Sequence, residues 1–130
     1  MTPDLAPDGL VAGFEPAVLR DRAALRRAMR ARRRALPPFE RRAAALAIAR
    51  HLAATGWLRP GARIAGYVAL AEEVDVAACL GLARRRGCEV LLPRIDSVRA
   101  GRMSFAPARG ALRRNAYGIL EPASPQRVGA

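Results

Sequence analysis

The length, composition and charge of the chain are those of a small folded domain. The chain has 130 residues, which predicts one domain, and 52% of them are hydrophobic while 26% are charged. Its formal net charge is +12, but all 23 basic residues are arginine. Abundant arginine and alanine without lysine is typical of a GC-rich genome, so the charge is weak evidence for nucleic-acid binding.

The sequence excludes a disulfide scaffold, a membrane span and a secretory signal. Cys79 and Cys88 are too few for a secreted disulfide framework, and their spacing fits no metal or redox pair, so we expect buried free thiols. No stretch is long enough to cross a membrane. The first residues lack a basic start followed by an apolar run. We therefore expect a cytoplasmic protein.

Two helices are predicted in the first half of the chain. Residues 1–16 are rich in proline, glycine and acidic residues, and we expect a disordered leader there. Residues 17–35 have helical composition, and "LPP" ends this helix because the residue before a proline avoids the helical region. A second helix is predicted over residues 38–54, with proline tolerated in its first turn. His51 lies on it among alanines and is interpreted as structural or solvated.

The arginines of the first predicted helix are not equivalent. One stripe of the helix is apolar and carries Val18, Leu25, Met29 and Leu36. Arg22 and Arg26 lie one turn apart beside this stripe, whereas Arg27 and Arg34 point the opposite way. Arg22 and Arg26 are therefore candidates for a phosphate clamp, and we interpret most of the other arginines as solvated charge.

The spacing of the hydrophobic residues changes from a helical to a strand-like pattern after residue 60. Residues 64–68 predict a strand that is buried on both faces. The loop "AEEVD" follows, and Asp75 is placed to cap the next helix, which ends at Gly87.

Two more strands are predicted beyond that helix. The first is "CEVLLPRI", closed by Pro93 and Arg94, and the second is "RMSFAPA", with Met103 and Phe105 on one face. The residues after them show no clear period.

This order of elements predicts an α/β layered domain with at least one crossover between parallel strands. Ligands of such sheets usually bind beyond the carboxyl ends of the strands, which here carry "VALAEEVD" and "LPRID". The sequence has no Walker loop, no metal-binding cluster and only one histidine, so we do not expect a Ser–His–Asp relay. Chemistry in this chain would depend on arginine, glutamate, backbone groups and a metal, which favours phosphate handling.

Five segments in order resemble the 5-formyltetrahydrofolate cyclo-ligase (methenyltetrahydrofolate synthetase) family. They are "RAALRRAMRARRRAL", "GYVALAEEVDV", "LLPRI", "MSF" and "NAYGILEP". The resemblance implies one three-layer α/β/α domain with a mainly parallel sheet, here spanning residues 17–122. It also implies an enzyme that uses ATP and Mg²⁺ to convert 5-formyltetrahydrofolate into 5,10-methenyltetrahydrofolate.

The resemblance also assigns site residues, although it names no catalytic residue and no metal ligand in this chain. Arg22 and Arg26 match the basic residues that face the ATP phosphates in the family, where the first is usually lysine. Glu73 matches the glutamate that contacts folate, and Val68 matches a position that contacts substrate through its backbone. Tyr117 matches an aromatic residue that shapes the substrate pocket. Arg94 and Met103 would lie near that pocket.

The sequence departs from the family pattern after its Glu-Pro pair. Family members continue with a core strand, an "AFD" segment and an arginine- and glycine-rich loop followed by "YYDR". These segments supply further phosphate contacts and the Mg²⁺-binding aspartate. The resemblance covers roughly the first two thirds of the family pattern, so we expect a sheet that lacks the family's C-terminal strands and a disordered tail over residues 123–130.

Two alternatives to an active enzyme stay open. One is an arginine-rich module that binds RNA or DNA, which the low aromatic content of 5% disfavours. The other is an inactive remnant. We expect a monomer without membrane or nucleic-acid partners, although an open sheet edge could promote self-association.

Overall fold

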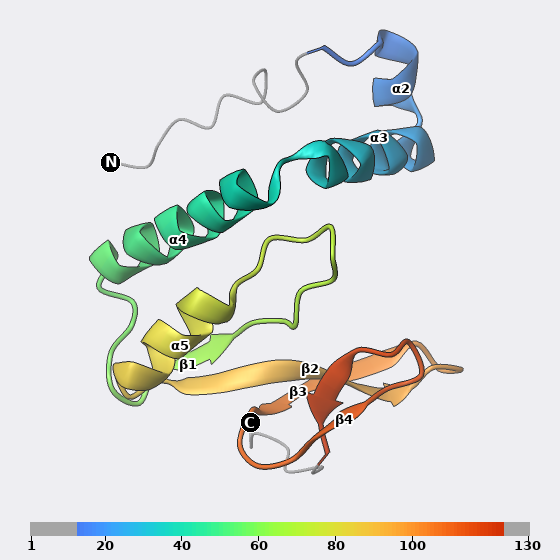
Figure 1. Cartoon of the computed structure of the whole chain (residues 1–130). Coiled ribbons are helices and arrows are strands. Elements are labelled where there is room, and N and C mark those ends of the chain that lie inside the picture. The colour runs from blue at the N-terminus through green and yellow to red at the C-terminus, as the bar shows by residue number, and fades with distance from the viewer. Residues whose placement is uncertain (1–12, 124–130) are drawn as a thin grey trace. The chain divides into compact units, whose positions relative to one another are not determined.

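The computed structural model describes residues 13–123, and the chain divides into two compact units after Leu36. The first unit contains the helices α2 (Pro16–Arg20) and α3 (Arg22–Ala35). The second contains the remaining helices and strands (Figure 1). Most of the predicted leader and tail lies outside the described residues. The prediction of one three-layer domain over residues 17–122 remains a prediction.

The first unit has two helices where the sequence predicts one. Asp21 interrupts the helix with an extended backbone, at φ −99° and ψ 108°. Its carboxylate Oδ1 accepts the Ala23 N–H at 2.9 Å, so the side chain caps α3. Aspartate competes in this way for backbone donors, which the composition of the segment did not reveal. Near the other end of α3, the Arg32 guanidinium lies 3.7 Å from the centre of the Phe14 ring.

The helices of the second unit follow the sequence prediction closely. Helix α4 (Pro38–Ala54) has the predicted bounds, with proline in its first turn. Helix α5 (Ala77–Arg85) has Val76 at its N-cap, where the sequence predicts Asp75, although Asp75 Oδ1 still accepts the Ala77 N–H at 2.9 Å from one residue further back. Gly87 follows α5 at φ +79°, in the left-handed region that glycine adopts without strain.

The main sheet is mixed, where mainly parallel strands were expected. Its strand order is β1 (Arg63–Ala65), β2 (Glu89–Ser97) and β3 (Arg102–Pro107). β1 and β2 are parallel and are joined through α5, as the predicted crossover requires. β2 and β3 are antiparallel, because only four residues connect them and a parallel pair needs a long crossover. The α/β class of the chain is confirmed, and the mainly parallel sheet is not found in the described part.

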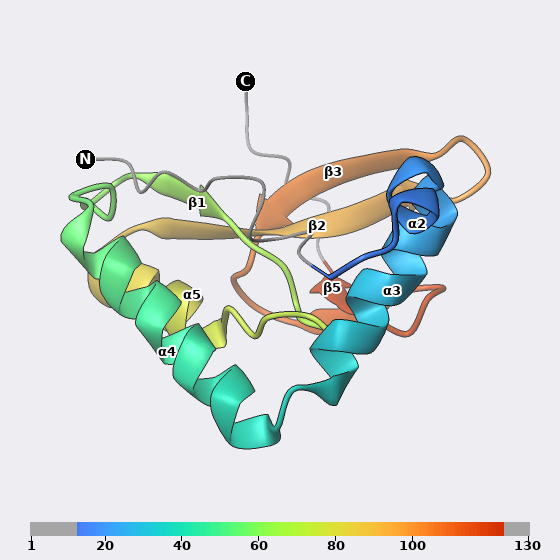
Figure 2. The ribbon, with the colours of Figure 1, turned by 90° about the horizontal axis from the view of Figure 1, so that it is seen from above.

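Pro93 does not close β2, contrary to the prediction. The odd-numbered residues of β2 direct their backbone groups toward β1, since Glu89 N–H donates to Ala62 and Leu91 C=O accepts from Gly66. Pro93 is the next residue on that side, just beyond the end of β1, so its missing N–H costs no ladder hydrogen bond. The β2–β3 ribbon therefore continues past β1 (Figure 2).

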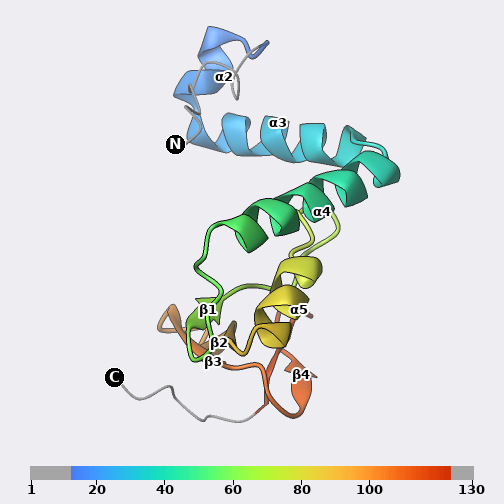
Figure 3. The same cartoon turned by 90° about the vertical axis from the view of Figure 1, so that its left-hand side faces the viewer.

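The core of the second unit lies between the sheet and α5. Helix α5 packs on β2, and α4 packs on α5 from the other side (Figure 3). The buried cluster consists of Leu58, Ala83, Cys88 and Val90, with Ile64 and Leu80 packed against it. Both cysteines are buried and free, as the sequence predicts. Met103 and Phe105 alternate with more buried residues along β3, so they share one face of the strand, as predicted, and both are exposed.

A second hairpin occupies the region in which no periodicity was found. It consists of β4 (Leu112–Arg114) and β5 (Leu120–Pro122), which pair antiparallel. Asn115 organises the connecting turn, because its Oδ1 accepts the N–H groups of Tyr117 and Ile119 at 2.9 and 3.1 Å. Gly118 completes the turn at φ +73°. The signal for this hairpin is local, an asparagine followed three residues later by glycine.

Glu121 fastens this hairpin to the main sheet. Its side chain is buried, with only 1% of the residue surface exposed. Oε2 accepts the Ile95 N–H of β2 at 2.9 Å, and Oε1 accepts from Arg113 Nε and lies 3.1 Å from Arg113 Nη2. Asn115 Nδ2 donates to the same carboxylate. Ile95 lies on the side of β2 beyond β1, so the carboxylate satisfies a donor that has no strand partner there.

Burial and hydrogen bonding act in opposite directions on this carboxyl group. Burial raises the pKa of Glu121, whereas the hydrogen bonds from Ile95, Arg113 and Asn115 lower it, and the lowering prevails. The charged form is therefore the one that the fold stabilises.

Replacing Glu121 should destabilise the second unit. Glu121→Gln keeps an acceptor for Ile95 but loses the charge facing Arg113, and we expect a loss of about 1–3 kcal/mol in the free energy of unfolding. Urea denaturation followed by circular dichroism measures it. Glu40→Gln, at an exposed position on α4, is the matched control and should change stability by less than about 0.5 kcal/mol. Equal stability of the two variants would contradict the role of Glu121.

The contribution of Glu121 to stability should depend on pH. Because its pKa is lower in the folded chain than in the unfolded chain, its stabilisation is complete above the unfolded pKa. It is lost as the pH falls through the lower, folded pKa. The difference in unfolding free energy between wild type and Glu121→Gln should thus shrink between about pH 7 and about pH 3. Urea titrations across this range test it, and a constant difference would show that the charge does not matter.

Candidate functional site

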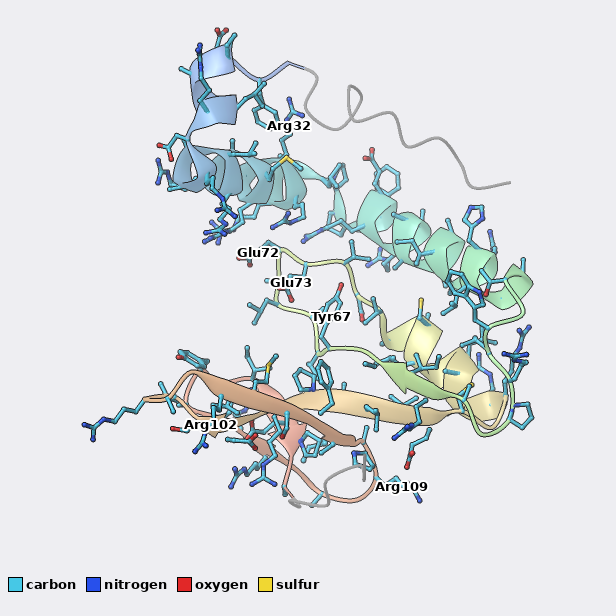
Figure 4. The ribbon with its side chains drawn as sticks, turned by 180° about the vertical axis from the view of Figure 1, so that it is seen from behind. Arg32, Tyr67, Glu72, Glu73, Arg102 and Arg109 are labelled. Carbon is cyan, nitrogen blue, oxygen red and sulfur yellow. The ribbon has the colours of Figure 1, made fainter. Side chains whose placement is uncertain are left out.

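The loop between β1 and α5, residues 66–76, is closed by its own hydrogen bonds. Glu73 N–H donates to Leu70 C=O at 3.0 Å, and Leu70 N–H donates back to Glu73 Oε2 at 2.9 Å. The Tyr67 hydroxyl crosses the loop and donates to Val74 C=O at 2.9 Å. Figure 4 shows the Tyr67 side chain pointing from the end of the strand toward the segment that carries Glu73. The loop is therefore a folded unit with a turn at residues 70–73.

Helix α4 holds the tip of this loop. Arg41, in the second turn of α4, donates from Nη1 to the Ala71 carbonyl at 2.7 Å. The two residues are thirty positions apart in the sequence, so the contact joins two elements that only the tertiary fold brings together. Arg41 is half-buried, as expected for an arginine whose stem packs while its head makes a hydrogen bond.

A cavity of about 780 Å³ opens beside this loop. Its walls come from α4, the loop, α5, β2 and β4, and all of them belong to the second unit. Tyr67, Leu80 and Leu92 contribute apolar surface, while Glu73 and Arg41 contribute charge. This volume and this mixture of apolar walls with a few polar groups are typical of sites for small organic ligands. Two other hollows, of about 340 and 270 Å³, are smaller and lie elsewhere on the second unit.

The charged groups of the cavity come from two sources. Glu73 and Asp75 lie on the loop, while Arg41 and Arg42 lie on α4 and Arg84 on α5. Asp75 Oδ1 accepts the Ala77 N–H at the start of α5, and Arg41 donates to the Ala71 carbonyl of the loop. Glu73 uses Oε2 in the turn, and no described residue donates to its Oε1. That oxygen can accept a hydrogen bond from a ligand without disturbing the turn.

Two of the sequence-predicted site residues meet at this cavity. Val68 and Glu73 both line it, at the carboxyl end of β1 where the sequence placed the site. Tyr117 does not line it. This residue lies in the β4–β5 turn with 65% of its surface exposed, and its backbone N–H is held by Asn115. Its predicted role in the pocket remains a prediction.

Arg22 and Arg26 belong to the first unit. Both lie on α3 and both are exposed, whereas Leu25 and Met29 of the same helix are half-buried. The helical pattern that the sequence predicts for α3 thus agrees with the exposure of these four residues. The assignment of the two arginines to ATP phosphates remains a prediction.

Arg94 and Met103 do not line the cavity. Arg94 is largely buried, and among the described residues its Nε and Nη1 have no hydrogen-bond partner. Asp96 Oδ1 lies 3.9 Å from Arg94 Nε, at the limit of an ion pair, and it accepts from the Ser104 hydroxyl at 3.0 Å. Met103 is exposed on β3.

The described residues hold no group of three or more histidine, cysteine, aspartate or glutamate side chains that could bind a metal ion. The Mg²⁺ that the resemblance implies therefore has no carboxylate cluster to receive it between residues 13 and 123. Within the same part of the chain, no helix is both long enough and apolar enough to span a bilayer.

Sequence reasoning missed Arg41 and the hydroxyl contact of Tyr67. Arg41 stands in "FERRAA", a run that looks like any solvated helix face in this arginine-rich chain. Nothing in its spacing points to Ala71. Helix α4 comes close to the loop because it packs on α5, and no sequence motif indicates this packing.

Comparison with known proteins identifies the family of the chain. The sequence pattern of the 5-formyltetrahydrofolate cyclo-ligase family matches residues 18–129 of the chain. The chain belongs to this family. No curated protein sequence matches the chain. The match includes both units, the candidate loop and the hairpin that carries Glu121.

Proposed function

We propose that this chain is an ATP-dependent 5-formyltetrahydrofolate cyclo-ligase that binds folate in the cavity beside residues 66–76. One observation carries the proposal. In a chain of this family, Glu73 and Val68 line a cavity large enough for a small organic ligand, and no described residue donates a hydrogen bond to Glu73 Oε1. The product would be 5,10-methenyltetrahydrofolate, with release of ADP and phosphate.

The cavity suits the chemistry of a reduced folate. A pterin is a flat ring with N–H donors along one edge, and a carboxylate such as Glu73 can accept from them. The side chains of Tyr67, Leu80 and Leu92 offer apolar surface for the faces of the ring. We assign substrate binding to Val68 and Glu73, and we keep Tyr117 as a candidate from the turn of the β4–β5 hairpin.

The second substrate, ATP, requires cationic groups for its phosphates. We assign this role to Arg22 and Arg26 of α3, because arginine can bind a phosphate with two parallel hydrogen bonds. ATP supplies the γ-phosphoryl group to the formyl oxygen, folate N10 then forms the new bond to the activated carbon, and the C–O bond breaks to release phosphate. The described residues hold no group of three or more histidine, cysteine, aspartate or glutamate side chains that could bind Mg²⁺, and we derive no step through the metal.

Glu73 variants should separate charge from loop structure. Glu73→Gln keeps a side-chain oxygen that can accept from Leu70 N–H, so the turn is retained and only the charge is lost. Glu73→Ala loses both. We expect 5-formyltetrahydrofolate to bind Glu73→Gln about tenfold more weakly than wild type, because hydrogen bonds to charged groups are worth roughly 1.5–3 kcal/mol. Isothermal titration calorimetry measures this change.

The control for this experiment is Glu72→Gln, a neighbouring carboxylate that does not line the cavity. It should bind folate as the wild type does. Equal affinities of wild type and Glu73→Gln would exclude Glu73 from the folate site.

We expect Arg26 to contribute to the affinity for ATP, and we expect its neighbour Arg27 not to contribute. Both residues are exposed on α3, but they point in different directions around the helix. We expect Arg26→Gln to weaken ATP binding about tenfold and Arg27→Gln to leave it within about twofold of wild type. Fluorescence titration with a nucleotide analogue measures both.

The same pair of variants tests the nucleic-acid alternative. A surface that binds RNA through charge alone would lose affinity equally in Arg26→Gln and Arg27→Gln, with a steep dependence on salt. That result, together with unchanged ATP binding, would favour a nucleic-acid module over the cyclo-ligase.

A further inference from the structure

We infer that Arg41 is a positioning residue for the folate site, holding the loop of residues 66–76 so that Glu73 faces the cavity. The inference rests on the proposed function for its role in catalysis. The hold on the loop itself rests on contacts within the second unit alone.

The contact of Arg41 is short and specific. Its Nη1 donates to the Ala71 carbonyl at 2.7 Å, a distance typical of a hydrogen bond strengthened by charge. Ala71 lies inside the turn that Leu70 and Glu73 close with two reciprocal hydrogen bonds. Any displacement of the Ala71 carbonyl therefore moves the turn, and the Glu73 carboxylate moves with it.

The hydrogen bonds within the loop do not by themselves fix its tip relative to α4. The turn at residues 70–73 and the bond from Tyr67 to Val74 give the loop its internal shape. Alanine at position 71 has only a methyl side chain, so its carbonyl is the group through which a hydrogen bond can hold this residue. Arg41 reaches it from a seventeen-residue helix, which is a rigid support. Sites placed by loops need such support, because a shift of about 1 Å costs activity.

Arg42 provides a natural comparison within the same helix. It is the next residue, carries the same charge and lines the same cavity, but no hydrogen bond or ion pair joins it to a described residue. A general effect of positive charge at the cavity would be shared by both arginines. An effect of holding Ala71 would belong to Arg41 alone.

Hydrogen–deuterium exchange of the ligand-free chain tests the hold on the loop. We expect the amides of Leu70 and Glu73 to exchange about fivefold faster in Arg41→Gln than in wild type, since one hydrogen bond to the loop is lost. Arg42→Gln should exchange like the wild type. Arg41→Lys keeps a donor and should restore part of the protection. Equal exchange in Arg41→Gln and Arg42→Gln would overturn the inference.

A double-mutant cycle tests whether this hold serves folate binding. We expect Arg41→Gln to weaken 5-formyltetrahydrofolate binding about fivefold, and the effects of Arg41→Gln and Glu73→Gln not to add. Arg50→Gln is the control for binding, because Arg50 is an exposed arginine of α4 that does not line the cavity, and it should change the affinity by less than about twofold. Additive effects would mean that Arg41 touches the ligand directly, which would overturn the positioning role. The positioning role would also be overturned if Arg41→Gln exchanged its loop amides faster but bound 5-formyltetrahydrofolate with unchanged affinity.

The two proposals fail in different ways. If wild type does not bind folate, the proposed function is wrong, and the exchange experiment still decides whether Arg41 holds the loop. If wild type binds folate and Glu73→Gln binds it weakly, but Arg41→Gln exchanges as Arg42→Gln does and binds folate as Arg50→Gln does, only the inference about Arg41 is wrong.

Discussion

The parallel pairing of β1 with β2 is the constraint on which the candidate site depends. A parallel neighbour cannot follow through a tight turn, so the chain must leave β1, cross over and return. Here the crossover consists of residues 66–76 and α5, and the register matches Ile64 with Val90. The loop that leaves β1 thus necessarily lies at the carboxyl end of that strand, where it borders the cavity. The position of the site follows from strand direction before any catalytic residue is considered.

Short elements in the second unit are held by polar side chains as much as by burial. β1, β4 and β5 have three residues each, which is too little for a backbone ladder to fix them alone. Glu121 ties β5 to the free side of β2, and Arg41 ties the loop to α4. Arg86 likewise donates to the Ala53 carbonyl at the end of α4, at 2.8 Å. In each case a long or charged side chain satisfies a backbone group that lacks a partner in regular structure.

The sequence predicted those parts of the fold that depend on local patterns. The bounds of α4 and the stop at Gly87 were both predictable, because each rests on the preference of a residue for its own backbone position. The break at Asp21 and the hairpin around Asn115 were also encoded locally, but periodicity does not detect them. The passage of β2 through Pro93 could not be predicted, since it depends on where the neighbouring strand ends.

The residues of the candidate site likewise include some that the sequence predicted and some that it did not. Val68 and Glu73 were predicted because they match a family pattern, and both line the cavity. Arg41 was not predicted, because its role is defined by a carbonyl thirty residues away and not by its neighbours in sequence. A pattern of residues can show which groups have the right chemistry, but the groups that hold them in place are found only from the tertiary contacts.

The arginines illustrate why composition alone says little about function in this chain. Arg113 faces a buried carboxylate, Arg41 a loop carbonyl, Arg86 a helix end and Arg32 an aromatic ring. The Arg32 contact lies within the first unit and the other three lie within the second, and none of the four requires a nucleic-acid partner. Arginine suits them because its guanidinium offers several donors on a long stem and stays charged at any physiological pH. A net charge of +12 is therefore compatible with an enzyme of small acidic substrates, in which part of the positive charge is already engaged by the fold.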